Sequence, residues 1–145
     1  MKTKTSIMLA FATITSMLLA LVTPVHATAP EALEITADMW VNLDGVTADG
    51  TFSANGVISE INQPAVETFF MDVAEGTIHG VKTLSGVHGT IIIKFQAAFT
   101  SPTTCVGTFV IISGTGDYTK LHGVGITDAT IDPMTGHLVA IYTGT

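Results

Sequence analysis

Two glutamates in apolar surroundings are the first candidates for chemistry. Glu60 ends a run in which apolar side chains recur at every second position from Phe52, and Glu67 shares a strand face with Phe69. Side chains alternate across a strand, and Pro64 breaks the chain between the two carboxylates, so we expect both to point into a barrel near one mouth. An apolar cavity raises a carboxyl pKa by desolvation and makes it a general acid or base. The alternative is that both lie at frayed strand ends and face water.

Aromatic residues supply the candidates for a ligand pocket. Their rings offer large apolar contact areas, and apolar side chains with a few polar groups line most small-molecule sites. In a small barrel the same residues can equally form the core or the rim. The candidate ligand-binding residues are Trp40, Phe52, Phe69, Phe95 and Tyr142.

The histidines and the cysteine do not indicate a metal site or a reactive nucleophile. A two-residue turn at Ser85 and Gly86 would place His79 and His88 on paired strands, offset by four residues or ~13 Å. One ion cannot bind both at that separation. Cys105 falls on a buried strand face with no basic residue within nine positions, and burial raises a thiol pKa. The sequence therefore predicts no metal ligand and no cofactor.

The elements that must position these residues are almost all strands. β-branched residues alternate with polar ones, and Gly, Pro, Asn and Asp clusters separate the runs. The predicted strands cover residues 33–43, 51–61, 65–72, 77–84, 87–99, 105–113, 124–131 and 137–143. This pattern predicts an all-β protein, an eight-stranded antiparallel barrel whose closure removes exposed edges. The alternative is a β-sandwich.

A glycine-rich corner separates the sixth and seventh predicted strands. Gly114-Thr115-Gly116 ends one strand and Gly123-Val124-Gly125 begins the next. We expect Gly116 to adopt positive φ where the chain turns sharply. We also expect Asp117 to cap a short helical turn and Leu121 to plug the barrel. A phosphate-binding loop is excluded because no Gly-Lys-Ser/Thr follows.

This corner resembles that of allene-oxide-cyclase-like and dirigent-like barrels. The segments Glu75-Gly76-Thr77-Ile78-His79-Gly80 and Gly86-Val87-His88-Gly89-Thr90-Ile91 resemble paired strands of the bacterial domain-of-unknown-function family 3224, which shares that barrel. The resemblance covers roughly residues 51–142 and implies the fold. The plant enzymes' catalytic residues have no counterparts that can be placed on this sequence, so their chemistry is not implied.

The N-terminus predicts export. Lys2 and Lys4 precede an apolar run over residues 7–21, and Pro24 and a Val25-x-Ala27 cleavage pattern follow. These are the three parts of a signal peptide. A transmembrane helix needs ~20 apolar residues, so an uncleaved anchor is the less favoured alternative. The prediction is a signal peptide at 1–27, a single β-barrel domain at 28–145, a secreted or periplasmic location, and no stable membrane anchor after cleavage.

Charge restricts the function classes. The chain has 5 Lys, no Arg and 12 carboxylates; removing Lys2 and Lys4 leaves 3 Lys against all 12, which changes the net charge from −7 to −9. Such a domain cannot neutralise a phosphate backbone, so nucleic-acid binding is excluded. The favoured function is binding of a small apolar ligand within the barrel. The alternatives are a cyclase- or isomerase-type enzyme using a buried carboxylate, and a purely structural secreted protein.

Two predicted strands are apolar on both faces and predict self-association. The strands over residues 87–99 and 105–113 place Ile92, Val110 and Ile112 on the face opposite the lumen. Strands apolar on both faces need cover on both sides. A symmetric dimer or trimer would supply it; the alternative is cover by the chain's own residues 28–33.

Overall fold

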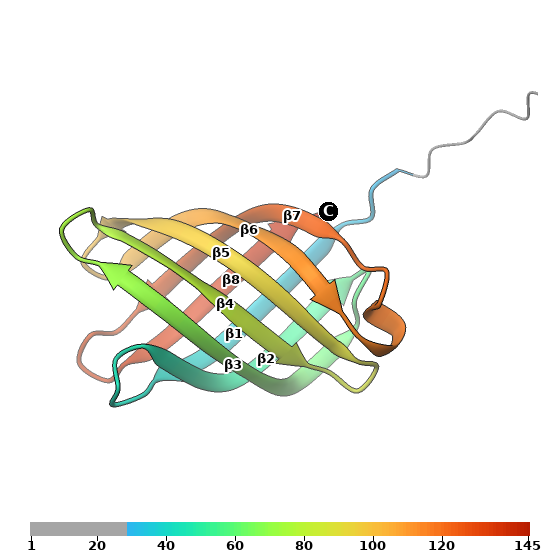
Figure 1. The fold of residues 1–145 in the computed structure, drawn as a ribbon, viewed down its shortest axis with the longest axis horizontal. Helices are drawn as coiled ribbons and strands as arrows, with labels where there is room; N and C mark the ends of the chain where they lie inside the picture. The colour runs from blue at the N-terminus through green and yellow to red at the C-terminus, as the bar shows by residue number, and fades with distance from the viewer. Residues whose placement is uncertain (1–28) are drawn as a thin grey trace, which may run out of the picture.

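Eight antiparallel strands close into a barrel in the computed structural model, which describes residues 29–145 (Figure 1). Each strand pairs with the next, and the last pairs with the first. The strands are β1 Leu33–Val41, β2 Thr47–Gly56, β3 Glu60–Asp72, β4 Thr77–Ser85, β5 Thr90–Ser101, β6 Thr104–Gly114, β7 Gly123–Ile131 and β8 His137–Gly144, and the short 3-10 helix η2, Gly116–Tyr118, lies between β6 and β7. The predicted barrel is confirmed, and the sandwich is excluded. The predicted signal peptide lies outside the described residues.

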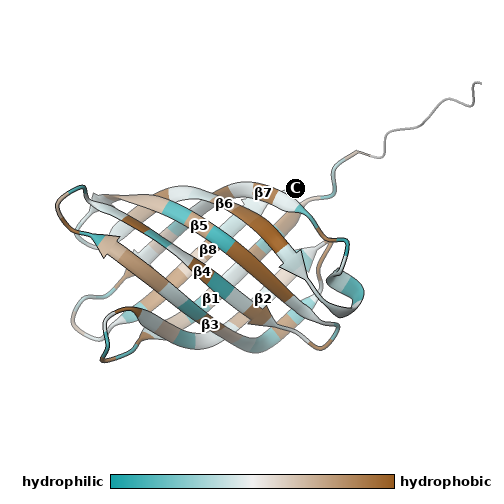
Figure 2. Cartoon of the chain, in the orientation of Figure 1, coloured by the Kyte–Doolittle hydropathy of each residue, from teal (hydrophilic) through white to brown (hydrophobic). Residues whose placement is uncertain are grey.

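Two-residue periodicity produces this wall. In β1, Leu33, Ile35, Ala37 and Met39 are buried, and the residues between them are exposed or half-buried. The other strands also mix hydrophobic and hydrophilic residues along their length (Figure 2). Inward side chains from all eight strands therefore form the core. No helix among residues 29–145 is long and apolar enough to cross a bilayer.

The β2–β3 ladder contains a bulge that the sequence did not predict. β2 ends at Gly56, and β3 runs from Glu60 through Pro64, where the sequence predicted a break. The β2–β3 ladder shifts between Phe52 and Ala54, Asn62 adopts a φ of 56°, and its N–H donates to Ser53 Oγ at 3.0 Å. The extra residue resets the alternation. As a result Glu60 and Glu67, seven positions apart, both point inward.

The β4–β5 hairpin also differs from the predicted two-residue turn. Ser85 pairs with Thr90, so four residues, 86–89, form the connection. His79 therefore lies opposite Gln96 instead of Ile92, and His88 belongs to the turn and not to a strand. Gly89, at a φ of 149°, allows the longer connection.

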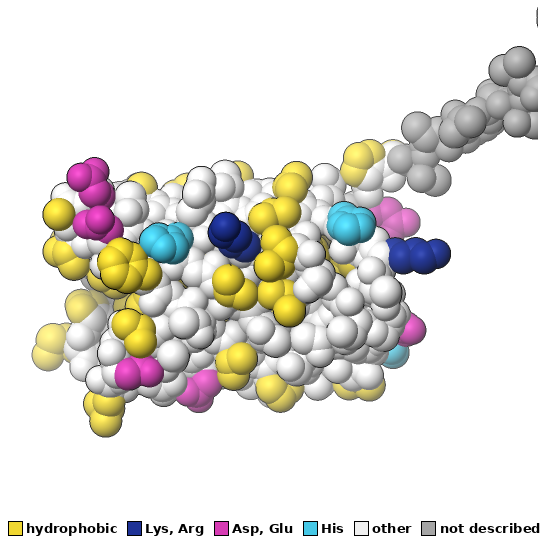
Figure 3. Space-filling model, in the orientation of Figure 1, with side chains coloured by type: hydrophobic (Ala, Val, Ile, Leu, Met, Phe, Trp, Pro, Cys, Tyr) yellow, Lys and Arg dark blue, Asp and Glu magenta, His cyan; other side chains and the backbone are white. Residues whose placement is uncertain are grey.

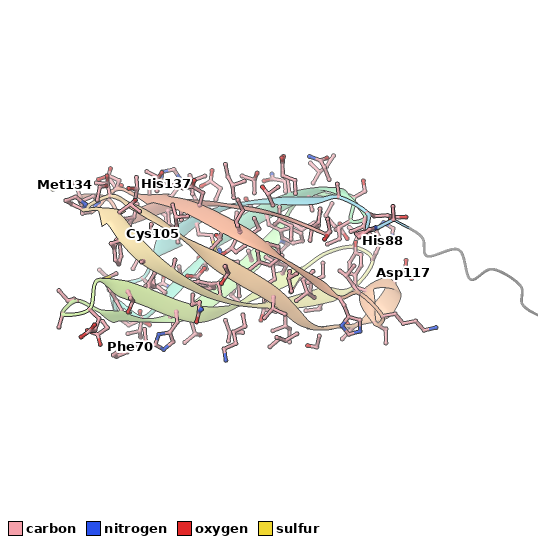
Figure 4. The ribbon with its side chains drawn as sticks, turned by 90° about the horizontal axis from the view of Figure 1, so that it is seen from above. Phe70, His88, Cys105, Asp117, Met134 and His137 are labelled. Atoms are coloured by element: carbon pink, nitrogen blue, oxygen red, sulfur yellow. The ribbon has the colours of Figure 1, made fainter. Side chains whose placement is uncertain are left out.

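The two ends of the barrel are built differently. One end, the turn end, carries four of the connections between neighbouring strands, at residues 42–46, 73–76, 102–103 and 132–136. The other, the plugged end, carries the connections at 57–59 and 86–89 and the corner that contains η2. Figure 4 shows Met134 at the turn end and His88 with Asp117 at the plugged end.

The glycine corner at the plugged end confirms one expectation, refines a second and corrects a third. Gly116 has a φ of 60°, as predicted. The half-buried Leu121 packs against the core as expected, but Tyr118 is the more deeply buried residue of the corner. The residue before η2 is Thr115, and it makes no side-chain capping bond, so Asp117 is not the cap.

We predict that Gly116→Val lowers the free energy of unfolding by on the order of 1–3 kcal/mol, because a β-branched residue is strained at positive φ. A Cβ at this position would also meet the His88 carbonyl. Gly116→Asn is the matched control: it adds the same Cβ but tolerates positive φ better, so it should lose less. Urea unfolding measures both, and an unchanged midpoint for the Val variant would contradict the strain.

Candidate functional site

A buried ion pair lies inside the barrel lumen, between two neighbouring strands. Glu67 of β3 and Lys82 of β4 are direct partners in the antiparallel ladder, and Lys82 Nζ lies 2.8 Å from Glu67 Oε2. The two residues are 4% and 0% exposed. Apart from each other, these two atoms have no hydrogen-bond partner among the described residues. Charges this dry are tolerated only when they are paired.

Sequence reasoning missed Lys82, although a signal for it exists. The predicted strand over 77–84 places Lys82 on the same face as Leu84, which is buried. One of only three lysines after the predicted signal therefore occupies a core position. A lysine there requires a buried acceptor, and Glu67 is that acceptor.

Tyr142 of β8 completes the cluster. Lys82 Nζ lies 5.0 Å from the centroid of its ring, and Phe109 packs against that ring edge-on at 5.3 Å. Burial alone would lower the pKa of Lys82, but its interactions with Tyr142 and Glu67 raise it above its ordinary value. Burial raises the pKa of Tyr142 despite the nearby ammonium. At neutral pH the lumen therefore holds a charged Lys82 and a neutral phenol.

A small cavity lies between this cluster and the turn end. Its volume is about 20 Å³, which is room for about one water. Glu67 is its single charged lining residue; the rest are Val41, Phe69, Met71, Ile78, Phe99, Cys105, Ala129, Ile131 and Leu138. Most of these side chains are half-buried or exposed. The turn end is therefore a narrow apolar mouth above a carboxylate.

The predicted pocket aromatics divide into two groups. Phe52, Phe69, Phe95 and Tyr142 point inward and are at most 6% exposed, so they fill the lumen. Trp40 points outward, is 51% exposed and stacks on His137 with 4.7 Å between ring centroids. Of the five, Phe69 lines the cavity at the mouth.

Glu60 holds the plugged end together. Its carboxylate accepts hydrogen bonds from Tyr118 Oη at 2.7 Å and from the backbone N–H groups of Val87 and His88, each at 3.2 Å. Gly86 makes room for it, because a Cβ there would overlap the carboxylate. The Glu60 side chain thus links the β4–β5 connection to η2, whose Tyr118 lies 58 positions further along the sequence than Glu60.

These donors reverse the expected pKa shift of Glu60. Burial would raise its pKa, but the bonds from Tyr118, His88 and Val87 lower it overall. Burial and the bond to Glu60 raise the pKa of Tyr118. Because the folded-state pKa of Glu60 is depressed, its contribution to stability is present above the ordinary glutamate pKa and is lost as the pH falls through the folded-state value. Glu60 is therefore an ionised carboxylate that accepts hydrogen bonds and stabilises the fold.

The two carboxylates do not share a mouth. Glu60 begins β3 at the plugged end, and Glu67 lies seven residues further along the same strand. At the rise of a strand this separates them by on the order of 20 Å. The expectation that Pro64 would bring them together was wrong, because β3 continues straight through that residue.

The histidines lie apart from this cluster, whereas Cys105 lines the cavity together with Glu67. His79 is on the outer surface of β4 beside Phe70, His88 Nδ1 lies 3.5 Å from an Asp117 oxygen, and His137 Nε2 lies 2.7 Å from Asp38 Oδ1. Among residues 29–145, no group of three or more His, Cys, Asp and Glu side chains could hold a metal ion. Burial, with the charges of Asp128 and Glu67, raises the pKa of the half-buried Cys105 thiol.

Comparisons with protein-family models, with curated proteins and with solved structures found no match to this chain. The chemistry of the site follows from its geometry: a dry ion pair, an apolar mouth above it, and a carboxylate that latches the opposite end.

We predict that Lys82→Met lowers the free energy of unfolding by about 3–5 kcal/mol, because it leaves the Glu67 carboxylate buried without a partner. The double variant Lys82→Met/Glu67→Leu removes both charges and should recover most of that loss. Urea unfolding of the two single variants and the double variant gives the coupling. Equal stability of Lys82→Met and the unsubstituted protein would show that the pair is not dry.

Proposed function

We propose that this protein is an exported barrel that binds a small apolar molecule at its turn end. The observation that carries the proposal is the difference between the two ends. Tyr118 and Glu60 close the plugged end, while the turn end is lined by apolar side chains that no element covers among the described residues. An apolar recess with one polar group at its floor is the common form of a small-molecule site.

The cavity at the mouth is small, but the side chains that line it can rearrange. Met71 and Leu138 stand at its rim, with Met71 37% exposed and Leu138 half-buried. Methionine is unbranched and adapts to irregular shapes. A ligand larger than one water enters by displacing these side chains, and the apolar area it buries supplies the free energy.

The enzyme alternative requires a free carboxylate, and among residues 29–145 both buried glutamates are already bound. Glu60 is held by three donors and Glu67 by Lys82. The structural alternative has one observation in its favour: the aromatic side chains fill the lumen and leave a cavity of about 20 Å³. A direct binding measurement separates this alternative from the binder.

We predict that an apolar fluorescent probe such as a naphthylphenylamine binds the exported protein and that Ala129→Leu weakens binding by roughly tenfold or more, because the added side chain fills the mouth. Ala129 is 8% exposed and lines the cavity. Ala98→Leu is the matched control, since the same substitution there falls on the exposed outer surface of β5. If the unsubstituted protein binds neither this probe nor long-chain alcohols, the structural alternative replaces the binder.

Self-association through the outer surface is a second proposal. Val110 and Ile112 are 37% and 48% exposed, and Val124, paired with Val110 on β7, extends the patch at 60%. The hydrophobic stretches of β5 and β6 form a band on this side (Figures 2 and 3). Residues 29–32 do not cover it: they are exposed, and the Ala32 carbonyl accepts from Val57 N–H beside β2.

We predict that the exported protein sediments as a dimer or trimer at micromolar concentration and that Val110→Glu shifts it to monomer, because a charge cannot be buried unpaired in an apolar interface. Thr68→Glu, on the exposed outer surface of β3, is the control. A monomer unchanged by Val110→Glu would refute the interface.

A further inference from the structure

Each of the four connections at the turn end presents at least one exposed apolar side chain. Leu43 is 109% exposed, Val73 82% and Met134 90%, and Pro102 is exposed in the fourth connection. We call these four residues the apolar tips. Hydrophobic side chains at this end stand out in the space-filling view, at the left of Figure 3. Single exposed apolar residues are ordinary, but four that surround one mouth form a surface.

Side-chain hydrogen bonds within the turns hold the apolar tips outward. Asp44 Oδ1 accepts from the N–H groups of Val46 and Thr47, both at 2.9 Å. Asp72 Oδ1 accepts from the N–H groups of residues 74 and 75 at 3.0 and 3.1 Å, and Asp132 Oδ1 accepts from Met134 N–H at 2.9 Å. Preorganised turns lose little entropy on docking. Insertion of the apolar tips into an apolar environment therefore costs little conformational entropy.

Two aromatic side chains stand just behind the tips. Trp40 precedes Leu43 by three positions and is 51% exposed; Phe70 precedes Val73 by three and is 57% exposed. Figure 4 shows Phe70 and Met134 toward the same end. Aromatic side chains, above all tryptophan, are typical of the boundary between water and lipid.

The acidic side chains around the apolar tips restrict the kind of surface to which this end can bind. Asp44, Glu75 and Asp132 lie in these connections, and Asp72 ends β3 beside them. The three lysines among residues 29–145 lie elsewhere: Lys82 in the lumen, Lys94 within β5 and Lys120 in the plugged-end corner. Anionic surfaces are repelled by this end. Two copies meeting mouth to mouth would bring the same carboxylates together.

We infer that the turn end docks on an uncharged, zwitterionic lipid surface, with the apolar tips in the interface and the mouth facing the acyl chains. The inference rests on the proposed function for its purpose: the apolar ligand is a molecule dissolved in the bilayer, and docking lets it reach the mouth without crossing water. The docking itself depends only on the tips, the rings behind them and the acidic turns.

Trp40, the single tryptophan of the chain, reports docking directly. The exported protein is titrated with phosphatidylcholine vesicles and with vesicles whose acyl chains carry bromine. The expected result is a blue shift of Trp40 emission, quenching by the brominated lipid, and co-sedimentation with the vesicles. Leu43→Asp and Met134→Asp should each weaken partitioning by roughly tenfold or more. Ile61→Asp is the matched control, because Ile61 is 79% exposed at the plugged end.

Lipid charge gives an independent test. Replacing about a quarter of the lipid by phosphatidylglycerol should weaken docking at low salt, and about 0.5 M salt should restore it. Absence of binding to phosphatidylcholine, a requirement for phosphatidylglycerol, or equal binding by Leu43→Asp would each overturn the inference. Self-association that Leu43→Asp abolishes without vesicles would assign the surface to a second copy instead.

The docking inference and the proposed ligand site can be tested independently. Ala129→Leu blocks the mouth but leaves the apolar tips intact, so it should retain vesicle docking while losing the probe. Docking by an unsubstituted protein that binds no probe would leave this inference standing and remove the proposed function.

Discussion

The pairing of β1 with β8 closes the wall, and the rest of the structure depends on that closure. Residues from Leu33 to Trp40 pair with residues from His137 to Gly144, so no strand edge remains unpaired. Closure also encloses one face of every strand in a narrow tube, where side-chain volumes must match. The large ring of Phe52 fits because Ala37 lies directly opposite it in the β1–β2 ladder.

A closed, packed tube excludes water, and this decides what its polar groups do. In water Lys82 would be one exposed cation; in the tube it is stable only against Glu67. Glu60 meets the same constraint at the plugged end and satisfies it with one hydroxyl and two backbone donors. Two glutamates of one strand thus have different roles: one balances a charge, and the other fastens the corner to a hairpin connection.

The connections between strands make the two ends of the closed barrel unequal. The corner around η2 fills one end, and the four connections at the turn end leave the other lined with apolar side chains. Because side chains fill the lumen, the proposed ligand site lies at this mouth and not at the centre of the barrel. The connections around the mouth carry exposed apolar side chains such as Leu43 and Met134, so apolar residues both line the cavity and surround it.

The sequence by itself determined what depends on neighbours along the chain. The alternation in β1, the turn at residues 132–136 and the positive φ of Gly116 follow from side-chain periodicity and from backbone sterics, which act over a few residues. Eight such strands in one domain implied the barrel. Only the tertiary structure decided the bulge at Asn62, the length of the β4–β5 connection, the partner of Lys82 and the direction of the pKa shift of Glu60. Each of these depends on groups that closure brings together from distant positions: Glu60 meets Tyr118 across 58 residues, and dry ion pairs and multiple hydrogen bonds have no signature in the local pattern.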